Sequence, residues 1–147
     1  MSLDDRWVHS SVDKLVEDTL DLCRELLEII VEDLRAAAAD VVVEGFQLLP
    51  ELVSGVGSSA RHALFLVATP EFRRATHFSR PHAWTTPLRT SDPERAQRNR
   101  LERDDRVGEH ILNAAEEQNL KVIVVDGSRN EDDIAAEGEA HLAGSRS

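Results

Sequence analysis

The sequence predicts a single α/β domain with a mainly parallel sheet and helices on both faces, a three-layer arrangement. Three short apolar runs rich in β-branched residues predict the strands, at 40–45, 63–70 and 120–127. Each run is followed by sequence that can form a helix. Continuous apolar strands that alternate with helices are typical of parallel sheets covered on both faces. Because 147 residues suffice for one core, we expect residues 1–147 to form one unit.

Helical periodicity predicts the remaining elements. The segment 10–39 has apolar residues at three- and four-residue spacing, which indicates one long amphipathic helix. Ser10 with Asp13 approximates a capping box at its start. The apolar stripe consists of Val12, Val16, Cys23, Leu26, Leu27, Ile30 and Leu34. Two further helices are predicted over 92–118 and 130–142, and residues 143–147 are expected to form a flexible tail.

The charge is strongly negative but unevenly distributed. A net charge of −11 disfavours nucleic acid as the main partner, because binding phosphates needs clustered cations. Residues 1–60 carry 13 acids against four bases, whereas residues 61–110 carry ten arginines against seven acids. A cationic segment in an acidic protein suggests a small anionic ligand, and a solvated surface strip is the alternative.

Composition also predicts a cytoplasmic protein. No run of 18 apolar residues could span a membrane, and the polar, acidic N-terminus does not resemble a secretory signal. The single cysteine, Cys23, cannot form an internal disulfide. Since Cys23 lies on the apolar stripe, we expect it in the core.

The motif VVVEG at 41–45 is the first candidate for chemistry. Glu44 follows a predicted buried strand, and the carboxyl ends of such strands border the crevice where open α/β sheets bind ligands. There Glu44 could hold a magnesium-bound water or orient an acceptor hydroxyl. An acid that only caps the next turn remains the alternative.

The second candidate is the arginine-rich region, of which 79–106 resembles a lid. Residues 79–91 contain two prolines and little periodicity, so we expect a mobile loop. The first half of the helix from Pro93 to Arg106 is almost free of apolar residues, so we expect it exposed or over a cleft. Guanidinium groups bind phosphate oxygens in pairs, which suits closure over a nucleotide.

The alternative for this helix is purely structural. Glu94 and Arg98, and likewise Glu102 and Arg106, lie four residues apart in the favourable order. Such pairs stabilise a solvated helix without any ligand. The sequence alone leaves both interpretations open.

Taken in order, these motifs resemble the nucleotide- and small-molecule-kinase group of P-loop proteins. The motifs are strand-Glu-Gly, a strand followed by Thr-Pro-Glu-Phe-Arg, the arginine-rich segment and LKVIVVDGSR. Bacterial ATP-binding proteins related to shikimate, adenylate and chloramphenicol kinases are the most similar in pattern, over roughly Trp7 to Leu142. The resemblance implies a P-loop kinase-like fold, ATP and Mg²⁺ as cofactors, and a small phosphorylated or hydroxylated ligand.

The resemblance also implies roles for individual residues. Glu44 would hold Mg²⁺ indirectly, and Glu44, Arg98 and Arg106 would be catalytic. The segment Asp126 to Arg129 resembles the loop near the adenine. The implied nucleotide-binding residues are Arg73, Arg74, Arg80, Arg95, Arg103, Asp126, Ser128 and Arg129.

The chain departs from this family at the phosphate-binding loop, GxxxxGK[ST]. The glycine-rich stretch 55–61, GVGSSAR, lacks the required lysine and follows no apolar strand, so we interpret it as an unrelated turn. Two hypotheses follow. The chain is a remnant or fragment of an ATP-dependent kinase that is inactive alone, through truncation or divergence. Alternatively, it is a non-catalytic oligomerising or interaction protein that retains the fold.

The missing loop has a consequence for the sheet. In the resembled fold the phosphate-loop strand lies between the Glu44 strand and the strand at 63–68, so its absence leaves two apolar edges unpaired. We expect 41–44 to pair directly with 64–67, giving a three-stranded parallel sheet. A homo-oligomer formed through an open sheet edge is the secondary expectation.

Overall fold

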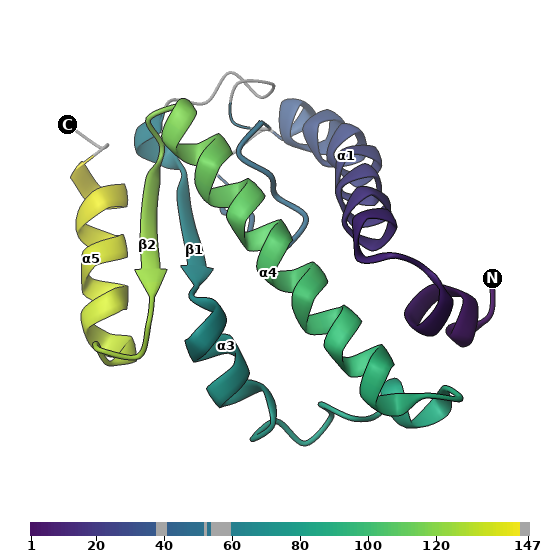
Figure 1. Ribbon diagram of the computed structural model, residues 1–147. Helices are drawn as coiled ribbons and strands as arrows, with labels where there is room; N and C mark the ends of the chain where they lie inside the picture. Colours follow the sequence, from purple (N-terminus) through teal and green to yellow (C-terminus); the bar gives the residue numbers. More distant parts are fainter. Residues whose placement is uncertain (38–40, 52, 54–59, 145–147) are drawn as a thin grey trace.

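The computed structural model describes residues 1–37, 41–51, 53 and 60–144. It has a mostly helical α/β fold in which helices flank a two-stranded parallel sheet (Figure 1). The elements are the π-helix η1 (Asp5–His9), α1 (Val12–Ala36), the 3₁₀ helix η2 (Ala60–His62), β1 (Leu64–Ala68), α3 (Pro70–His77), the 3₁₀ helix η3 (Pro87–Arg89), α4 (Pro93–Glu117), β2 (Lys121–Val125) and α5 (Glu131–Ala143).

Helices cover both faces of the sheet, as predicted. Strands β1 and β2 run parallel, with Leu64 opposite Lys121 and Ala68 opposite Val125. A Cβ built on Gly108 of α4 would lie 3.6 Å from Val67, and one built on Gly138 of α5 would lie 3.0 Å from Leu64. Leu64 and Val67 point to opposite faces because strand side chains alternate. Helices α4 and α5 therefore pack on opposite faces.

The third predicted strand does not form. Residues 41–44 are irregular, and no backbone hydrogen bond within the described residues joins them to β1. Direct closure into a three-stranded sheet is therefore wrong. Val41, Val42 and Val43 instead lie beside the last turns of α1 with 54%, 96% and 39% of their surface exposed. A β-branched run forms a buried strand only when a neighbouring strand supplies its backbone hydrogen bonds, and no described strand does so for 41–44.

Hydrogen exchange should distinguish the irregular residues 41–43 from the two strands. We expect fast exchange of the backbone amides at 41–43, and slow exchange across β1 and β2, whose amides pair in the ladder. Exchange mass spectrometry of the intact protein checks this. Strong protection at 41–43 would mean that these residues do join a sheet in solution. Fast exchange over 79–91 stays a prediction that the same measurement tests.

The long α4 helix is the centre of the packing. It contacts α1, η1, η3 and both strands, and it runs diagonally across Figure 1. One buried cluster joins η1, α1 and α4 through Trp7, Val8, Leu15 and Ala96. A second consists of Leu20, Cys23 and Leu49, with Val16, Val107 and Ile111 packed against it. Cys23 is thus a core residue, as expected, and burial raises the pKa of its thiol.

The start of α4 is not the exposed arm that its composition predicts. Ala96 is fully buried and Gln97 is 3% exposed, because η1 packs against this half of the helix. The guanidinium carbons of Arg100 and Arg103 lie 5.6 and 5.0 Å from the ring centre of Trp7. A small alanine and the aliphatic parts of arginines can bury an aromatic ring without any large apolar residue. The expectation that this half lies exposed is therefore wrong for the face that carries Ala96 and Gln97, and correct for the face that carries Glu94, Arg95 and Arg98.

The other predicted helices form close to their expected limits. Helix α1 is capped by Ser11, whose hydroxyl accepts from the Lys14 amide at 3.2 Å, rather than by Ser10. Residues 79–91 form turns and η3, with Ala83 and Pro87 buried against the body. Within the described residues, no helix combines the length and the hydropathy that crossing a bilayer requires.

Candidate functional site

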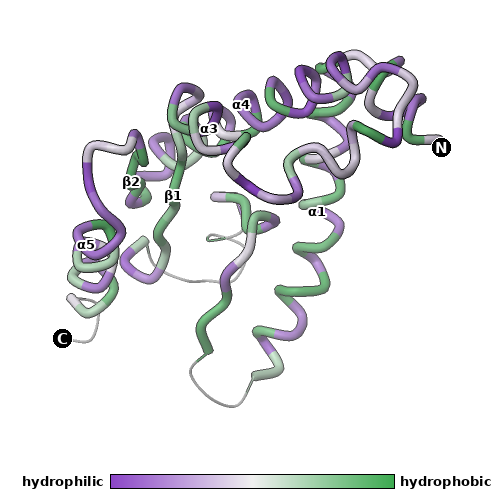
Figure 2. The backbone as a smooth tube through the Cα atoms, turned by 90° about the horizontal axis from the view of Figure 1, so that it is seen from below, coloured by the Kyte–Doolittle hydropathy of each residue, from purple (hydrophilic) through white to green (hydrophobic). Residues whose placement is uncertain are grey.

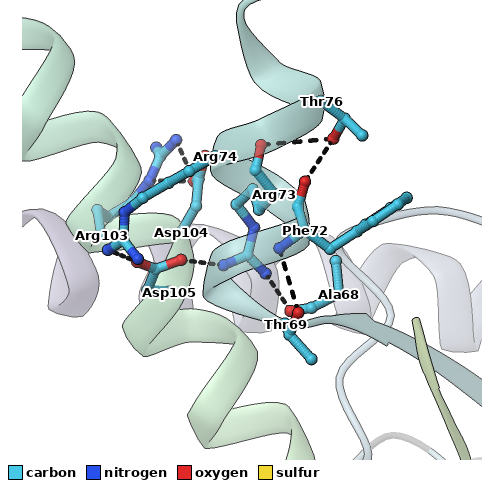
Figure 3. Close-up of polar contacts among 9 residues, drawn as sticks. All are labelled: Ala68, Thr69, Phe72, Arg73, Arg74, Thr76, Arg103, Asp104 and Asp105. Atoms are coloured by element: carbon cyan, nitrogen blue, oxygen red, sulfur yellow. Dashed lines mark hydrogen bonds and ion pairs between the residues drawn. The ribbon is translucent and has the colours of Figure 1, made fainter. Parts of the chain in front are cut away.

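The candidate site begins at the carboxyl end of β1, where α3 starts. Thr69 caps α3 by accepting a hydrogen bond from the Phe72 amide at 3.2 Å, and Pro70 occupies the first turn. Proline suits this position because its missing N–H would have no helical partner there. The cap fixes the start of α3, so Arg73 and Arg74 lie on the side that faces α4 (Figure 3).

Asp105 of α4 binds both of these arginines. One carboxylate oxygen accepts from Nη1 of Arg73 and the other from Nη2 of Arg74. Arg73 also donates from Nη2 to the carbonyl oxygen of Ala68 at 3.1 Å, which ties the network to the end of β1 (Figure 3). The side chain of Asp105 is 12% exposed and that of Arg73 is 19% exposed. The two arginines predicted to bind phosphate therefore share one carboxylate of the chain itself, which offsets one of their two positive charges.

Arg103 and Arg106 also bind carboxylates of the chain. Nε of Arg103 donates to Asp104 at 2.8 Å, and Nη1 of Arg106 donates to Asp13 of α1 at 2.5 Å. Arg106 thus links α4 to α1, whereas the sequence favoured a pair with Glu102 on its own helix. Both arginines have structural partners in this fold.

The remaining arginines of this region are exposed. The side chains of Arg80, Arg95 and Arg98 lie at the surface, beyond the end of α3 and on the outer face of α4. Arg95 also contributes its backbone amide to the cap of α4, donating to Asp92 at 3.0 Å. Within the described residues these three arginines form no side-chain ion pair, whereas the half-exposed Arg74 is bound to Asp105.

The loop after β2 forms a self-contained turn. Asp126 accepts hydrogen bonds from the amide and hydroxyl of Ser128 at 2.9 and 2.6 Å, and these bonds lower the pKa of Asp126. Gly127 has a φ of +86°, and a Cβ there would lie 2.9 Å from the ring of Phe72. Glycine is therefore required both by the backbone angle and by the contact with α3.

Arg129 belongs to an ion-pair network rather than to an open site. It donates to Glu137 of α5 at 2.5 Å, and Lys121 of β2 binds the other oxygen of the same carboxylate. Hydrogen bonds from Arg129 and Lys121 lower the pKa of Glu137 to about 2. The network fastens α5 to the end of the sheet.

Glu44 lies apart from these groups. It is exposed in the irregular segment beside α1, whereas Arg73 and Arg74 lie beyond the end of β1. Within the described residues, no three His, Cys, Asp or Glu side chains gather closely enough to hold a metal ion. A triphosphate at the arginine cluster would compete with Asp105 for Arg73 and Arg74, and the expectation of ATP and Mg²⁺ stays a prediction. The glycine-rich stretch 55–61 lies mostly outside the described residues.

Sequence reasoning missed a polar cluster between α3 and α4. Gln97 contacts His77 through its side-chain amide, and Nη1 of Arg100 donates to the carbonyl of Ala83 at 3.3 Å. Burial and the neighbouring Arg100 lower the pKa of His77. A glutamine within an otherwise charged helix was the available signal for this cluster.

A second region of interest is an uncovered apolar surface on α1. The buried residues of α1 all precede Arg24, and beyond Cys23 the predicted apolar stripe is only half-buried. Two hollows flank this half of the helix. Figure 2 shows the hydrophobic segment after residue 40 running beside it. We define the α1 surface as the apolar residues that line one of these hollows, namely Ile30, Leu34, Ala37 and Val41 to Val43.

Comparison of the chain with protein-family models, with curated proteins and with solved structures finds no match. The kinase resemblance therefore rests on the motifs quoted above. The function has to be argued from the geometry of the chain.

Proposed function

We propose that this chain is a non-catalytic interaction protein built on a kinase-like α/β fold, and that it binds its partner through the α1 surface. The observation that carries the proposal is the exposure of this surface. Val41 and Val42 are 54% and 96% exposed, although the valine run at 41–43 has the sequence pattern of a buried strand. Contiguous apolar patches rimmed by polar residues mark interaction sites in soluble proteins.

The kinase-like part of the proposal is supported by topology and motifs. The parallel strands β1 and β2 are joined through α3 and α4, and an acid-glycine pair follows the valine run at 41–43. Phosphoryl transfer depends on positioned cations and amides around the phosphates. Since Arg73, Arg74, Arg103 and Arg106 are bound to carboxylates, the described residues offer little of this cradle. We therefore infer a remnant of a kinase that is inactive alone.

Calorimetry tests the loss of nucleotide binding. Titration of the isolated protein with millimolar Mg-ATP should give no saturable heat, because the exposed arginines are dispersed and Arg73, Arg74, Arg103 and Arg106 are bound to carboxylates. A micromolar dissociation constant that Glu44→Gln abolishes would contradict the proposal, since that residue is the one implied to hold Mg²⁺.

Self-association through the edge of β1 that pairs with no other described strand is the second candidate function. Leu66 at the centre of this strand is 60% exposed, which leaves an apolar side chain next to the sheet edge that 41–44 was expected to fill. Exposed strand edges pair readily with other strands. Sedimentation measures whether the wild-type protein and Leu66→Lys are monomers or dimers. A wild-type dimer that Leu66→Lys abolishes would support this candidate, and a wild-type monomer would contradict it.

A further inference from the structure

The connection between α3 and α4 belongs to an acid-free stretch of an acidic protein. Residues 72–91 contain no aspartate or glutamate, although the net charge of the protein is −11. We define the aromatic loop as residues 77–90 of this stretch, in which Arg80 and Arg89 are exposed. In the part of the chain that the structure describes, neither of these arginines forms an ion pair. The aromatic loop therefore presents two guanidinium groups to which no described carboxylate is bound.

The same loop exposes apolar side chains. The ring of Phe78 is 53% exposed and stacks on Trp84, with the ring centres 5.9 Å apart and the planes at 30°. Leu88 is 68% exposed. Aromatic residues and arginine are enriched at protein interfaces and at their energetic hot spots, whereas lysine, aspartate and glutamate are depleted there. The aromatic loop has this composition, because it contains arginine, phenylalanine and tryptophan but no lysine or acid.

The aromatic loop is anchored to α4. Ala83 and Pro87 are buried, and Arg100 of α4 donates to the carbonyl oxygen of Ala83 at 3.3 Å. Backbone hydrogen bonds link its successive turns, for example from the Leu88 amide to the Trp84 carbonyl at 3.0 Å. A surface that is already ordered loses less conformational entropy when a partner binds.

The acids at the far end of the loop are engaged by backbone amides. Asp4 accepts a hydrogen bond from the Ser91 amide at 2.8 Å, and Asp92 accepts one from the Arg95 amide at 3.0 Å. The loop is also separate from the α1 surface. In Figure 1 it joins α3 to α4 at the lower end of the molecule, whereas the last turns of α1 lie at the upper end.

We propose that the aromatic loop binds an acidic segment of a partner protein that carries apolar side chains between its carboxylates. The apolar side chains pack on Phe78, Trp84 and Leu88, which supply the contact area. The carboxylates pair with Arg80 and Arg89, whose planar guanidinium groups can bind both oxygens of a carboxylate. This surface is additional to the α1 surface, so its failure leaves the function proposed above unaffected.

Two other occupants are disfavoured by charge. A symmetric dimer formed through the loop would place Arg80 and Arg89 opposite the same arginines. Single-stranded nucleic acid can stack on exposed rings, but it carries a charge at every nucleotide. The net charge of −11 opposes its approach along the whole strand. A short acidic segment presents its charges only at the loop.

A synthetic peptide provides the probe. A short labelled peptide in which pairs of leucine and glutamate alternate is titrated with the intact protein and followed by fluorescence anisotropy. Two matched peptides carry serine in place of leucine, or lysine in place of glutamate, and a labelled oligothymidylate represents nucleic acid. We expect saturable binding of the leucine-glutamate peptide alone. Absence of this binding, equal binding of a matched peptide, or tighter binding of the oligothymidylate would overturn the proposal.

The fluorescence of Trp84 reports whether the peptide lies on the loop. The chain has two tryptophans, and Trp7 is 7% exposed within a buried cluster. Trp84 is half-buried, so acrylamide should quench mainly its emission. Saturating peptide should reduce the quenching, because it covers the rings of Phe78 and Trp84. Unchanged quenching at saturation would place the peptide elsewhere and contradict the assignment to the loop.

A phenylalanine variant tests the apolar part of the contact. Phe78→Ser should weaken peptide binding at least about tenfold, as expected for an aromatic residue at the centre of an interface. Phe78 belongs to neither buried cluster, so the change leaves the core intact. Phe46→Ser is the matched control, since Phe46 is 75% exposed in the segment after α1, and it should not change binding. Equal weakening by the two variants would contradict a contact at Phe78.

A pair of arginine variants tests the charged part. Arg80→Gln combined with Arg89→Gln should weaken binding about tenfold, because the peptide carboxylates lose their partners. Arg95→Gln combined with Arg98→Gln changes the net charge equally on the outer face of α4 and serves as the control. Equal weakening by both pairs would show a response to net charge only and would overturn the site. Sedimentation without peptide completes the test, since a dimer lost in Phe78→Ser would assign the loop to a second copy instead.

Discussion

Replacing Asp105 with alanine lowers the free energy of unfolding by about 3 kcal/mol, which is the expected cost of removing one partner from a mostly buried ion pair. The carboxylate binds Arg73 and Arg74 together, and Arg73 is largely buried beside the carbonyl of Ala68. Without Asp105 the guanidinium of Arg73 keeps only this neutral acceptor in the network. Urea denaturation followed by circular dichroism gives the loss of stability.

The exposed pair of Asp21 with Arg24 on α1 provides the control for this variant. Their side chains are 58% and 51% exposed. Because exposed pairs contribute little, Asp21→Ala should cost less than about 1 kcal/mol. If the two variants are equally stable, Asp105 does not hold α3 against α4. A double variant in which Arg73 is also replaced by methionine should recover part of the loss, since no buried charge then lacks a partner.

Much of the fold could be predicted from sequence patterns that are local. The three long or capped helices α1, α4 and α5 follow from apolar spacing and cap residues, and β1 and β2 follow from short apolar runs that precede helices. The valine run at 41–43 has the same pattern but forms no strand. The spacing of apolar residues predicts which side chains a segment could bury. A strand also needs hydrogen bonds to a neighbouring strand, and the sequence of one segment does not show whether such a neighbour is present.

The candidate site was less predictable because its important contacts join distant segments. Arg73 and Asp105 are 32 residues apart, and Arg106 and Asp13 are 93 residues apart. The sequence identifies the arginine-rich region. Whether each guanidinium group is available to a ligand depends on which carboxylates the folded chain places next to it. The same limit explains the start of α4, where burial comes from Ala96 against Trp7 rather than from a visible apolar stripe.

Leu49 joins the irregular segment after α1 to the core, and its replacement by alanine should also have a large effect. The side chain is fully buried in contact with Leu20 and Cys23, between α1 and α4. Truncating a buried leucine removes its transfer free energy and leaves a cavity, at a cost of about 3 kcal/mol. Denaturant unfolding of Leu49→Ala measures this cost. Leu49→Met, which nearly conserves volume, should cost less than about 1.5 kcal/mol.

The thiol of Cys23 gives a second readout at the same place. Cys23 is 1% exposed, so a thiol reagent should react with it slowly in the wild-type protein. A cavity at position 49 makes local opening easier, and the reaction in Leu49→Ala should be at least about tenfold faster under native conditions. Leu88→Ala is the control, since Leu88 is 68% exposed and its truncation should change neither stability nor thiol reactivity. Unchanged reactivity in Leu49→Ala would mean that Leu49 does not cover Cys23, and the packing of this segment between α1 and α4 would be wrong.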